Sequence, residues 1–300
     1  MKLLLTFILT STLITVQAQT KADSIKLIQQ SVDLLDLDFT DAEADSMLGS
    51  INSNYQLYKA MHRTLPTNDI TFPFAFNPAP AGTKIPKKQL RIYWDVPTQT
   101  ELPSDKNELA FYSIPQLASL IMNKKISSVE LTKFFIARLK KWDDTLEAVI
   151  TLTEELALKQ AKKADDELKA GIYRGPLHGI PYGLKDLFAV KGYKTTWGTT
   201  PYMDQVLDVD SYVYTELKNH GAVLCAKLSL GALAYNNKWF GGETKNPWNL
   251  SQGSSGSSAG SAAAVTAGLL PFAIGTETLG SIVSPSTKEI IAKFPNLKHV

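Results

Sequence analysis

The sequence predicts an α/β fold, in which helices pack against a central sheet. From about residue 108 onward, short segments rich in β-branched residues alternate with longer segments of helical periodicity, and this alternation is typical of α/β proteins. The composition agrees, because 44% of the residues are hydrophobic and 20% are charged, as in ordinary folded proteins. At 300 residues, the chain is long enough for one large domain or two small ones.

The charge balance and the scarcity of metal-binding side chains exclude several classes of protein. Lys and Arg total 31 against 29 Asp and Glu, so the basic excess typical of nucleic-acid-binding proteins is missing. The single cysteine, Cys225, cannot form an internal disulfide, and the four histidines lie far apart without an H-E-x-x-H pattern. We therefore expect neither a metal centre nor a nucleic-acid partner.

Residues 1–18 have the pattern of a secretory signal peptide. Lys2 gives a basic start, an apolar run follows from Leu3 to Val16, and Ala18 is the small residue that a signal peptidase recognises. The run is shorter than the ~20 residues that a membrane-spanning helix needs, which disfavours a stable membrane anchor. We expect cleavage after Ala18 and a periplasmic or secreted protein.

Residues 19–63 are predicted to form a helical segment. Hydrophobic residues recur there at helical spacing, and Thr40 followed three residues later by Glu43 is a capping box that predicts the start of a second helix. Residues 64–106 contain seven prolines and little periodicity, which indicates an extended connector with one short strand at Gln89–Trp94.

The pattern is densest in residues 107–287. Three longer helices and one strand come first: helices Ser113–Met122, Ser127–Trp142 and Glu154–Ala170, with a strand at Leu146–Thr151. Short strands and helices then alternate over Gly179–Tyr182, Tyr212–His220, Ala222–Ala226, Gly260–Ala267 and Phe272–Gly275. Cys225 lies in one of the predicted buried strands, where an inert core cysteine is the expected role.

The stretch Gly253–Ala264, G-S-S-G-S-S-A-G-S-A-A-A, has an unusual composition. A flexible linker has such a composition, but this stretch leads directly into an apolar segment that must be buried. A Walker phosphate loop needs a lysine, and none lies between Lys245 and Lys288. We predict a loop rich in hydroxyl groups, closely approached by other backbone, that leads into a helix.

Three segments together resemble a known family. They are Gly179–Asp186 (G-I-P-Y-G-L-K-D), Gly256–Ser261 (G-S-S-A-G-S) and Gly275–Ile282 (G-T-E-T-L-G-S-I). In this order and spacing they closely resemble the amidase signature family, the serine hydrolases with a Ser–cis-Ser–Lys triad. The resemblance extends from about Leu109 to Ser286. It implies a mixed central β-sheet flanked by helices on both faces, and no cofactor.

The resemblance also implies catalytic roles. Ser281 matches the nucleophile, Ser257 the bridging cis-serine and Lys185 the general base. A serine hydroxyl needs a base to take its proton, and burial suits a lysine to that task because it disfavours the ammonium form. The oxyanion hole would be formed by four backbone N–H groups, those of Thr278, Leu279, Gly280 and Ser281.

Three further residues are expected to support the triad. Gly256 lowers the steric resistance to a cis bond before Ser257, and Ser258 serves hydrogen bonds of the loop and helix capping. Asp186 is expected to orient the loop around Lys185. His178 is predicted to be a packing or hydrogen-bonding residue rather than a base.

The chain departs from the family pattern near its end. Leu279 and Val283 stand where many members have glycine and arginine, and the family's later glycines do not recur in residues 288–300. We therefore expect residues 288–300 to be a divergent tail of a member that is truncated at its C-terminus, with an incomplete sheet.

The leading interpretation is a secreted or periplasmic amidase that hydrolyses a carboxamide C–N bond of a small molecule. An acyl-enzyme would form on Ser281, the amine or ammonia would leave, and water would release the acid. A second interpretation is a catalytically incompetent amidase fragment with little activity. A third is one component of an aminoacyl-tRNA amidotransferase, which shares these motifs; the leader disfavours it because charged tRNA is cytoplasmic.

Overall fold

The computed structural model describes residues 20–65, 79, 82–84, 86–88 and 92–293. The chain divides into two compact units, with the boundary between Gln89 and Leu90. The predicted signal peptide, residues 1–18, lies outside the described residues. The first half of the strand predicted at Gln89–Trp94 also lies outside them, and its described part, Ile92–Trp94, is not a strand.

Two α-helices make up most of the described part of the first unit. They are α1 (Lys21–Val32) and α2 (Asp41–Thr64), with a 3-10 turn, η1 (Asp33–Leu35), after α1. The hydroxyl of Thr40 accepts a hydrogen bond from the backbone N–H of Glu43, whose carboxylate accepts one from the backbone of Thr40 in return. This reciprocal pair confirms the predicted capping box and the start of the second helix.

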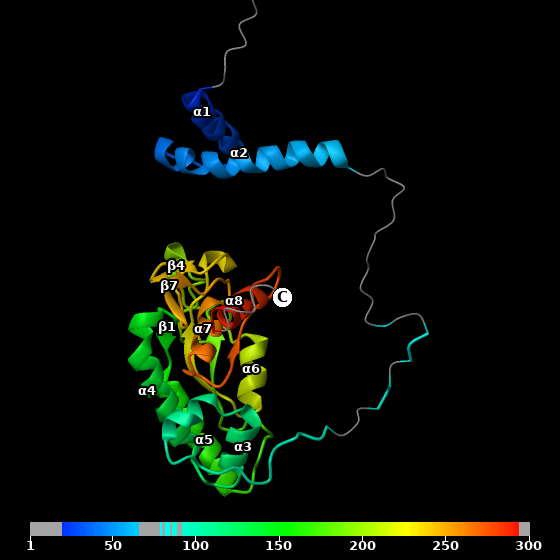
Figure 1. Ribbon diagram of the computed structural model, residues 1–300, viewed down its shortest axis with the longest axis vertical. Coiled ribbons are helices and arrows are strands. Elements are labelled where there is room, and N and C mark those ends of the chain that lie inside the picture. The colour runs from blue at the N-terminus through cyan, green and yellow to red at the C-terminus, as the bar shows by residue number, and fades with distance from the viewer. Residues whose placement is uncertain (1–19, 66–78, 80–81, 85, 89–91, 294–300) are drawn as a thin grey trace, which may run out of the picture. The chain divides into compact units, whose positions relative to one another are not determined.

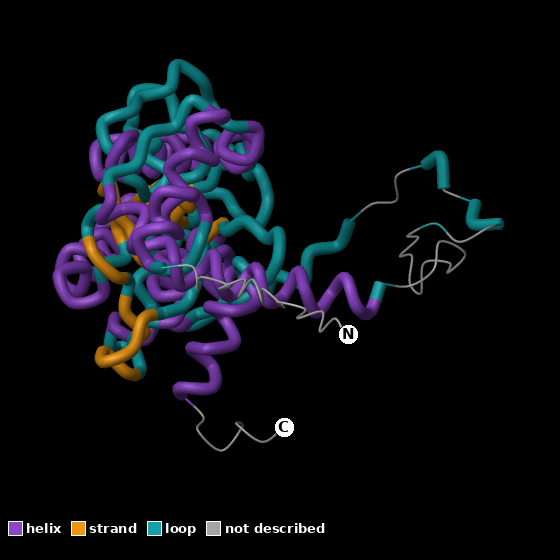
Figure 2. The backbone as a smooth tube through the Cα atoms, turned by 90° about the horizontal axis from the view of Figure 1, so that it is seen from above, coloured by secondary structure: helices purple, strands orange, loops and turns teal. Residues whose placement is uncertain are grey.

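A four-stranded mixed sheet forms the centre of the second unit (Figure 1). In sheet order its strands are β1 (Val149–Leu152), β3 (Val223–Leu228), β2 (Pro181–Lys185) and β8 (Ala273–Ile274). Strand β2 runs parallel to both β3 and β8, whereas β1 is antiparallel to β3. Figure 2 shows these strands in orange among the helices of the unit. The mixed α/β fold class is confirmed.

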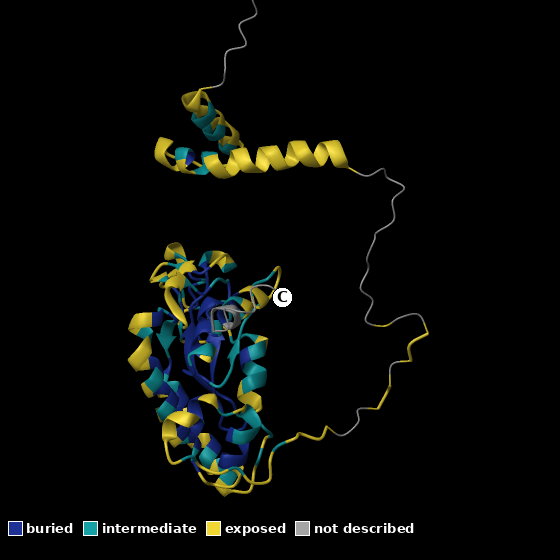
Figure 3. Cartoon of the chain, in the orientation of Figure 1, coloured by how far each residue is buried: buried dark blue, intermediate teal, exposed yellow. Residues whose placement is uncertain are grey.

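Helices cover both faces of this sheet. They are α3 (Ile114–Met122), α4 (Ser128–Leu146), α5 (Glu154–Lys169), α6 (Tyr212–Asn219), α7 (Ala259–Thr266) and α8 (Val283–Lys293). One apolar cluster joins Phe135 of α4 and Ala263 of α7 to Cys225 of β3, and a second joins Tyr214 of α6 to Leu224. Because alternate residues of a strand point to opposite faces, the two clusters lie on opposite faces of the sheet, in the buried centre of Figure 3.

Short elements complete the second unit. They are the 3-10 helices η2 (Lys106–Phe111), η3 (Thr200–Tyr202) and η4 (Ala232–Ala234), and two small antiparallel sheets, β4 (Lys238–Trp239) with β5 (Gly242–Glu243) and β6 (Lys245–Asn246) with β7 (Asn249–Gly253). Among the residues that the structure describes, no helix has the length and hydropathy needed to cross a membrane.

Several predicted element boundaries are shifted by a few residues, and two of these shifts have a clear local reason. The strand predicted at Gly179–Tyr182 begins later, at Pro181, because Gly179 has a positive φ of 77° and belongs to a turn. The helix predicted to end at Trp142 continues to Leu146 and stops where Glu147 adopts the left-handed conformation (φ 51°). The same strand also continues beyond the predicted Tyr182 to Lys185, and this matters for function, since it places Lys185 at the end of β2.

Candidate functional site

Lys185 is the centre of the candidate site. It is the last residue of β2, and its side chain is fully buried. The strand's alternation places it on the face opposite Leu184, which packs in the cluster around α6. The amine nitrogen lies within hydrogen-bond distance of three hydroxyl oxygens, at 2.8 Å from Ser257 Oγ, 3.1 Å from Ser258 Oγ and 2.7 Å from Thr276 Oγ1.

The surroundings of Lys185 bring the pKa of its amine close to neutral pH. Burial lowers the pKa of the Lys185 amine to about 8, and the negative charge of Glu277 opposes that change. With such a pKa, roughly one amine in ten is neutral at pH 7. A lysine in this range can exchange a proton with a neighbouring hydroxyl at physiological pH.

The loop before α7 brings Ser257 and Ser258 to Lys185. Its Gly256–Ser257 peptide bond is cis, as the family resemblance implies. A Cβ atom at Gly256 would overlap the carbonyl oxygen of Asn236, so the close approach of these two backbone segments requires glycine. The support expected from Gly256 therefore includes backbone packing as well as freedom around the cis bond.

Ser258 connects this loop to the turn that follows β8. Its N–H donates to the carbonyl oxygen of Ser281 at 2.9 Å. Its hydroxyl donates to the carbonyl oxygen of Thr276 and accepts from the N–H of Thr276, both at 3.2 Å. Thr276 was not among the site residues predicted from the sequence, although it lies in the G-T-E-T-L-G-S-I segment that follows the half-buried strand β8.

Ser281 is held by its backbone. Its carbonyl accepts from Ser258, and its N–H donates to a carboxylate oxygen of Glu277 at 2.9 Å. The Ser281 hydroxyl forms no hydrogen bond with any residue that the structure describes. The structure thus brings Lys185, Ser257 and Ser258 into direct contact, and places Ser281 beside them without a hydrogen bond from its side chain.

Glu277 is a second residue that sequence reasoning missed. Its carboxylate accepts hydrogen bonds from the N–H groups of Ser281, Ile282 and Val283, at 2.9, 2.5 and 3.0 Å, at the N-terminus of α8. These bonds, led by that from Ile282, lower the pKa of Glu277. A carboxylate at this position also suits the partial positive charge of a helix N-terminus.

Of the four N–H groups expected to form the oxyanion hole, two interact with the Glu277 carboxylate and two do not. The N–H of Ser281 is bound to Glu277, and the N–H of Gly280 also stabilises that carboxylate. The N–H groups of Thr278 and Leu279 have no hydrogen-bond partner within the described part of the chain. Leu279, which stands where many members of the family have glycine, is 95% exposed to solvent.

Asp186 lies behind the site in a buried ion pair. Its carboxylate is 2.5 Å from Lys227 Nζ, and both side chains are fully buried. The other carboxylate oxygen accepts from the N–H and the hydroxyl of Thr196, at 2.7 and 2.6 Å. Burial lowers the pKa of Lys227, and the negative charge of Asp186 opposes this. Asp186 thus fixes the loop around Thr196 and forms no hydrogen bond with the Lys185 amine.

Two residues that were predicted to be structural are buried outside this cluster. His178 Nε2 is 2.9 Å from the carbonyl oxygen of Ala164, which fits the predicted hydrogen-bonding role. Cys225 is buried in β3, and burial raises the pKa of its thiol. An un-ionised, inaccessible thiol agrees with the interpretation of an inert core cysteine.

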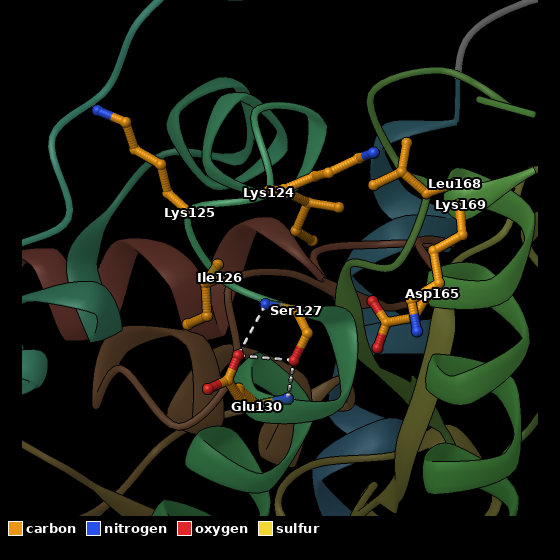
Figure 4. Close-up of a pocket in the computed structure, with 9 residues that line it drawn as sticks. Lys124, Lys125, Ile126, Ser127, Glu130, Asp165, Leu168 and Lys169 are labelled. Atoms are coloured by element: carbon orange, nitrogen blue, oxygen red, sulfur yellow. Dashed lines mark hydrogen bonds between the residues drawn. The ribbon is translucent and has the colours of Figure 1, made fainter. Parts of the chain in front are cut away.

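Two hollows differ in their relation to the site. One, of about 380 Å³, is lined by Ser258, Gly275 and Ile282 together with residues of α7, so it adjoins the site. The other, of about 220 Å³, lies at the start of α4 (Figure 4). Its carboxylates are already bound there, Glu130 to Ser127 and Asp165 to the backbone of α4, and it contains no residue of the Lys185 cluster.

Comparison with known proteins identifies relatives of the second unit. The family model described as Amidase matches residues 130–290. The A component of the glutamyl-tRNA(Gln) amidotransferase from Marinomonas sp. (strain MWYL1) is 44% identical over 179 residues, which are 58% of this chain and 36% of that protein.

Solved structures of amidases are also similar to this part of the chain. The native peptide amidase from Stenotrophomonas maltophilia superposes with a TM-score of 0.56 and 38% identity, covering 59% of this chain and 38% of that one. A fatty acid amide hydrolase gives a TM-score of 0.57 and 31% identity, covering 61% and 33%. The chain therefore spans little more than a third of the length of the curated relatives that it matches.

Proposed function

The chain belongs to the amidase family, and on that premise we propose that the protein hydrolyses a carboxamide C–N bond through an acyl-enzyme on Ser281. The observation that carries the proposal is the hydrogen bond between Lys185 Nζ and Ser257 Oγ, at 2.8 Å in a buried site. It pairs an amine of lowered pKa with the hydroxyl of Ser257, whose neighbour Ser258 donates its N–H to the carbonyl oxygen of Ser281. An activated hydroxyl next to a base is the arrangement that acyl transfer needs.

The proposed first step moves two protons in sequence. Neutral Lys185 takes the proton of Ser257, and Ser257 takes that of Ser281 as the Ser281 oxygen attacks the amide carbon. The Ser281 hydroxyl, which has no partner among the described residues, turns toward Ser257 for this step. The N–H groups of Thr278 and Leu279 are the available donors for the developing oxyanion.

The proposed second half returns the protons and frees the enzyme. The C–N bond breaks, and the leaving nitrogen takes a proton back along the path from Lys185 through Ser257. Water then attacks the acyl group on Ser281 and gives its proton to Lys185 through Ser257. The same path returns this proton to the Ser281 oxygen as the bond to the acyl group breaks and the acid leaves. No step requires a metal or an organic cofactor, and the substrate we propose is a small-molecule amide.

A second candidate function is that of an amidotransferase component that acts on aminoacyl-tRNA. Its support is the 44% identity to the Marinomonas protein. The predicted leader disfavours it, and on the same ground we propose a periplasmic or secreted location. One assay distinguishes the two functions: an amidase releases ammonia from a simple amide without any tRNA, whereas an amidotransferase of this kind converts glutamyl-tRNA(Gln) to its amide.

The experiment that tests the nucleophile is labelling with a fluorophosphonate probe, which reacts with activated serines. We expect the protein to be labelled and the Ser281→Ala variant to remain unlabelled. Ser284→Ala is the matched control, because Ser284 lies on the same segment but its hydroxyl, among the residues that the structure describes, bonds to Ser255 rather than to the Lys185 cluster. Equal labelling of the protein and of Ser281→Ala would reject the assignment.

A further inference from the structure

The orientation of the Lys185 amine determines whether it can act as a base. Among the residues that the structure describes, its hydrogen-bond partners are three hydroxyl groups, those of Ser257, Ser258 and Thr276. A protonated amine donates three hydrogen bonds, whereas a neutral amine donates two and has one lone pair. Two of the three hydroxyls therefore accept the N–H bonds of the neutral amine, and the lone pair faces the third.

The Ser258 hydroxyl can only accept from Lys185. Its single proton is donated to the carbonyl oxygen of Thr276, and one of its lone pairs accepts from the N–H of Thr276. The second lone pair is left for the amine, which lies 3.1 Å away. One N–H of Lys185 is thus directed to Ser258 in both protonation states.

The Thr276 hydroxyl is the closest of the three partners, at 2.7 Å from the amine nitrogen. This contact is the only hydrogen bond of the Thr276 side chain with described residues. The backbone N–H and the carbonyl oxygen of Thr276 are both hydrogen-bonded to the Ser258 hydroxyl. The hydroxyl is therefore held in place by a partner that belongs to the same cluster. When it accepts the second N–H of a neutral amine, the lone pair of Lys185 is left facing Ser257.

We propose that Thr276 is a positioning residue whose hydroxyl holds one N–H of Lys185, so that the lone pair of the amine faces Ser257. The inference rests on the proposed function, in which Lys185 removes the proton of Ser257. As that proton passes from Ser257 Oγ to Lys185 Nζ, the amine becomes an ammonium group with three N–H bonds. Each of these then has one of the three side-chain oxygens as acceptor.

Loss of the Thr276 hydroxyl has two effects of opposite sign. Hydrogen bonds to the charged form of a group favour that form, so removal of one acceptor lowers the pKa of Lys185 further below about 8. A larger share of the lysine is then neutral at pH 7. The rate falls nevertheless, because an amine without its second acceptor can turn an N–H, rather than its lone pair, toward Ser257.

The test compares Thr276→Val, which has nearly the same shape, with Thr276→Ser, which keeps the hydroxyl. The titration of Lys185 is followed in the folded protein by NMR of a ¹³C-labelled lysine side chain, with Lys185→Met identifying the signal. Independently, kcat/KM for an amide is measured against pH. We expect Thr276→Val to lower the titration midpoint by about one pH unit and kcat/KM by roughly 10- to 100-fold. Thr276→Ser should stay close to the unaltered protein in both.

The titration keeps this inference separate from the proposed function, because it needs no turnover. If the unaltered protein hydrolyses no amide, the amidase proposal fails, and the midpoint in Thr276→Val still decides whether Thr276 holds the amine. An unchanged or raised midpoint in folded Thr276→Val overturns the inference, as does a Thr276→Ser variant that behaves like Thr276→Val. Thr276→Ala, which removes the same hydroxyl, replaces Thr276→Val if the latter does not fold.

Discussion

The pH dependence of hydrolysis tests the assignment of Lys185 as the base. With a pKa of about 8, the neutral fraction of Lys185 is about 1% at pH 6, about 10% at pH 7 and about half at pH 8. If the neutral amine is the reactive form, kcat/KM rises about tenfold from pH 6 to pH 7 and about fivefold from pH 7 to pH 8. Above pH 9 the value levels off, because nearly all of the lysine is then neutral.

Replacement of the lysine links this profile to one residue. Lys185→Met keeps most of the apolar volume and removes the base, so we expect kcat/KM to fall by roughly 10²- to 10⁴-fold. The residual rate should rise with pH without levelling near 8. Lys133→Met, at an exposed position of α4, is the matched control and should keep the full profile. A profile that is flat between pH 6 and 9, or one that survives in Lys185→Met, would refute the reasoning.

Three further results are expected. Ser281→Ala and Ser257→Ala should each lower kcat by several orders of magnitude, and the double variant should be little worse than the worse single variant, since the residues act as a unit; additive losses in stopped-flow or steady-state assays would contradict this. Burial raises the pKa of Glu289 to about 8 from an ordinary 4.5, so the free energy of unfolding should fall as pH rises from about 4.5 to 8, and Glu289→Gln should lose that slope in urea titrations. N-terminal sequencing of exported protein should begin at Gln19, and recovery of intact Met1 from the cytosol would argue against the leader.

The sequence predicted the parts of the site that depend on local pattern. Composition singled out the hydroxyl-rich stretch around Ser257, whereas the segment around Lys185 and the catalytic roles followed from the resemblance of three ordered motifs to the amidase signature family. Helix starts were also predictable: the capping box expected at Thr40 is present, and the helix expected from Ser127 has Ser127 as its N-cap.

Interactions between distant segments could not be predicted in this way. Thr276 and Lys185 are 91 positions apart, and only the pairing of β8 with β2 brings them together. In the sequence, Glu277 looks like an ordinary polar residue of a turn. Its hydrogen bonds to backbone N–H groups exist only because helix α8 begins a few residues later. Within residues 288–300, for which the sequence predicts a divergent tail, Glu289 of α8 is buried and bonded to Thr266 of α7. Burial of a carboxyl group has no signature in a one-dimensional pattern.

The measurement that tests the central claim most directly is the identification of the residue that becomes acylated during turnover. The protein is mixed with an activated amide or ester substrate, quenched in acid within milliseconds, digested and mapped by mass spectrometry. The account predicts one acyl group per active site, attached to the Ser281 oxygen and absent from Ser281→Ala. An acyl group on Ser257 or on any other residue, or hydrolysis that proceeds in Ser281→Ala, would contradict it.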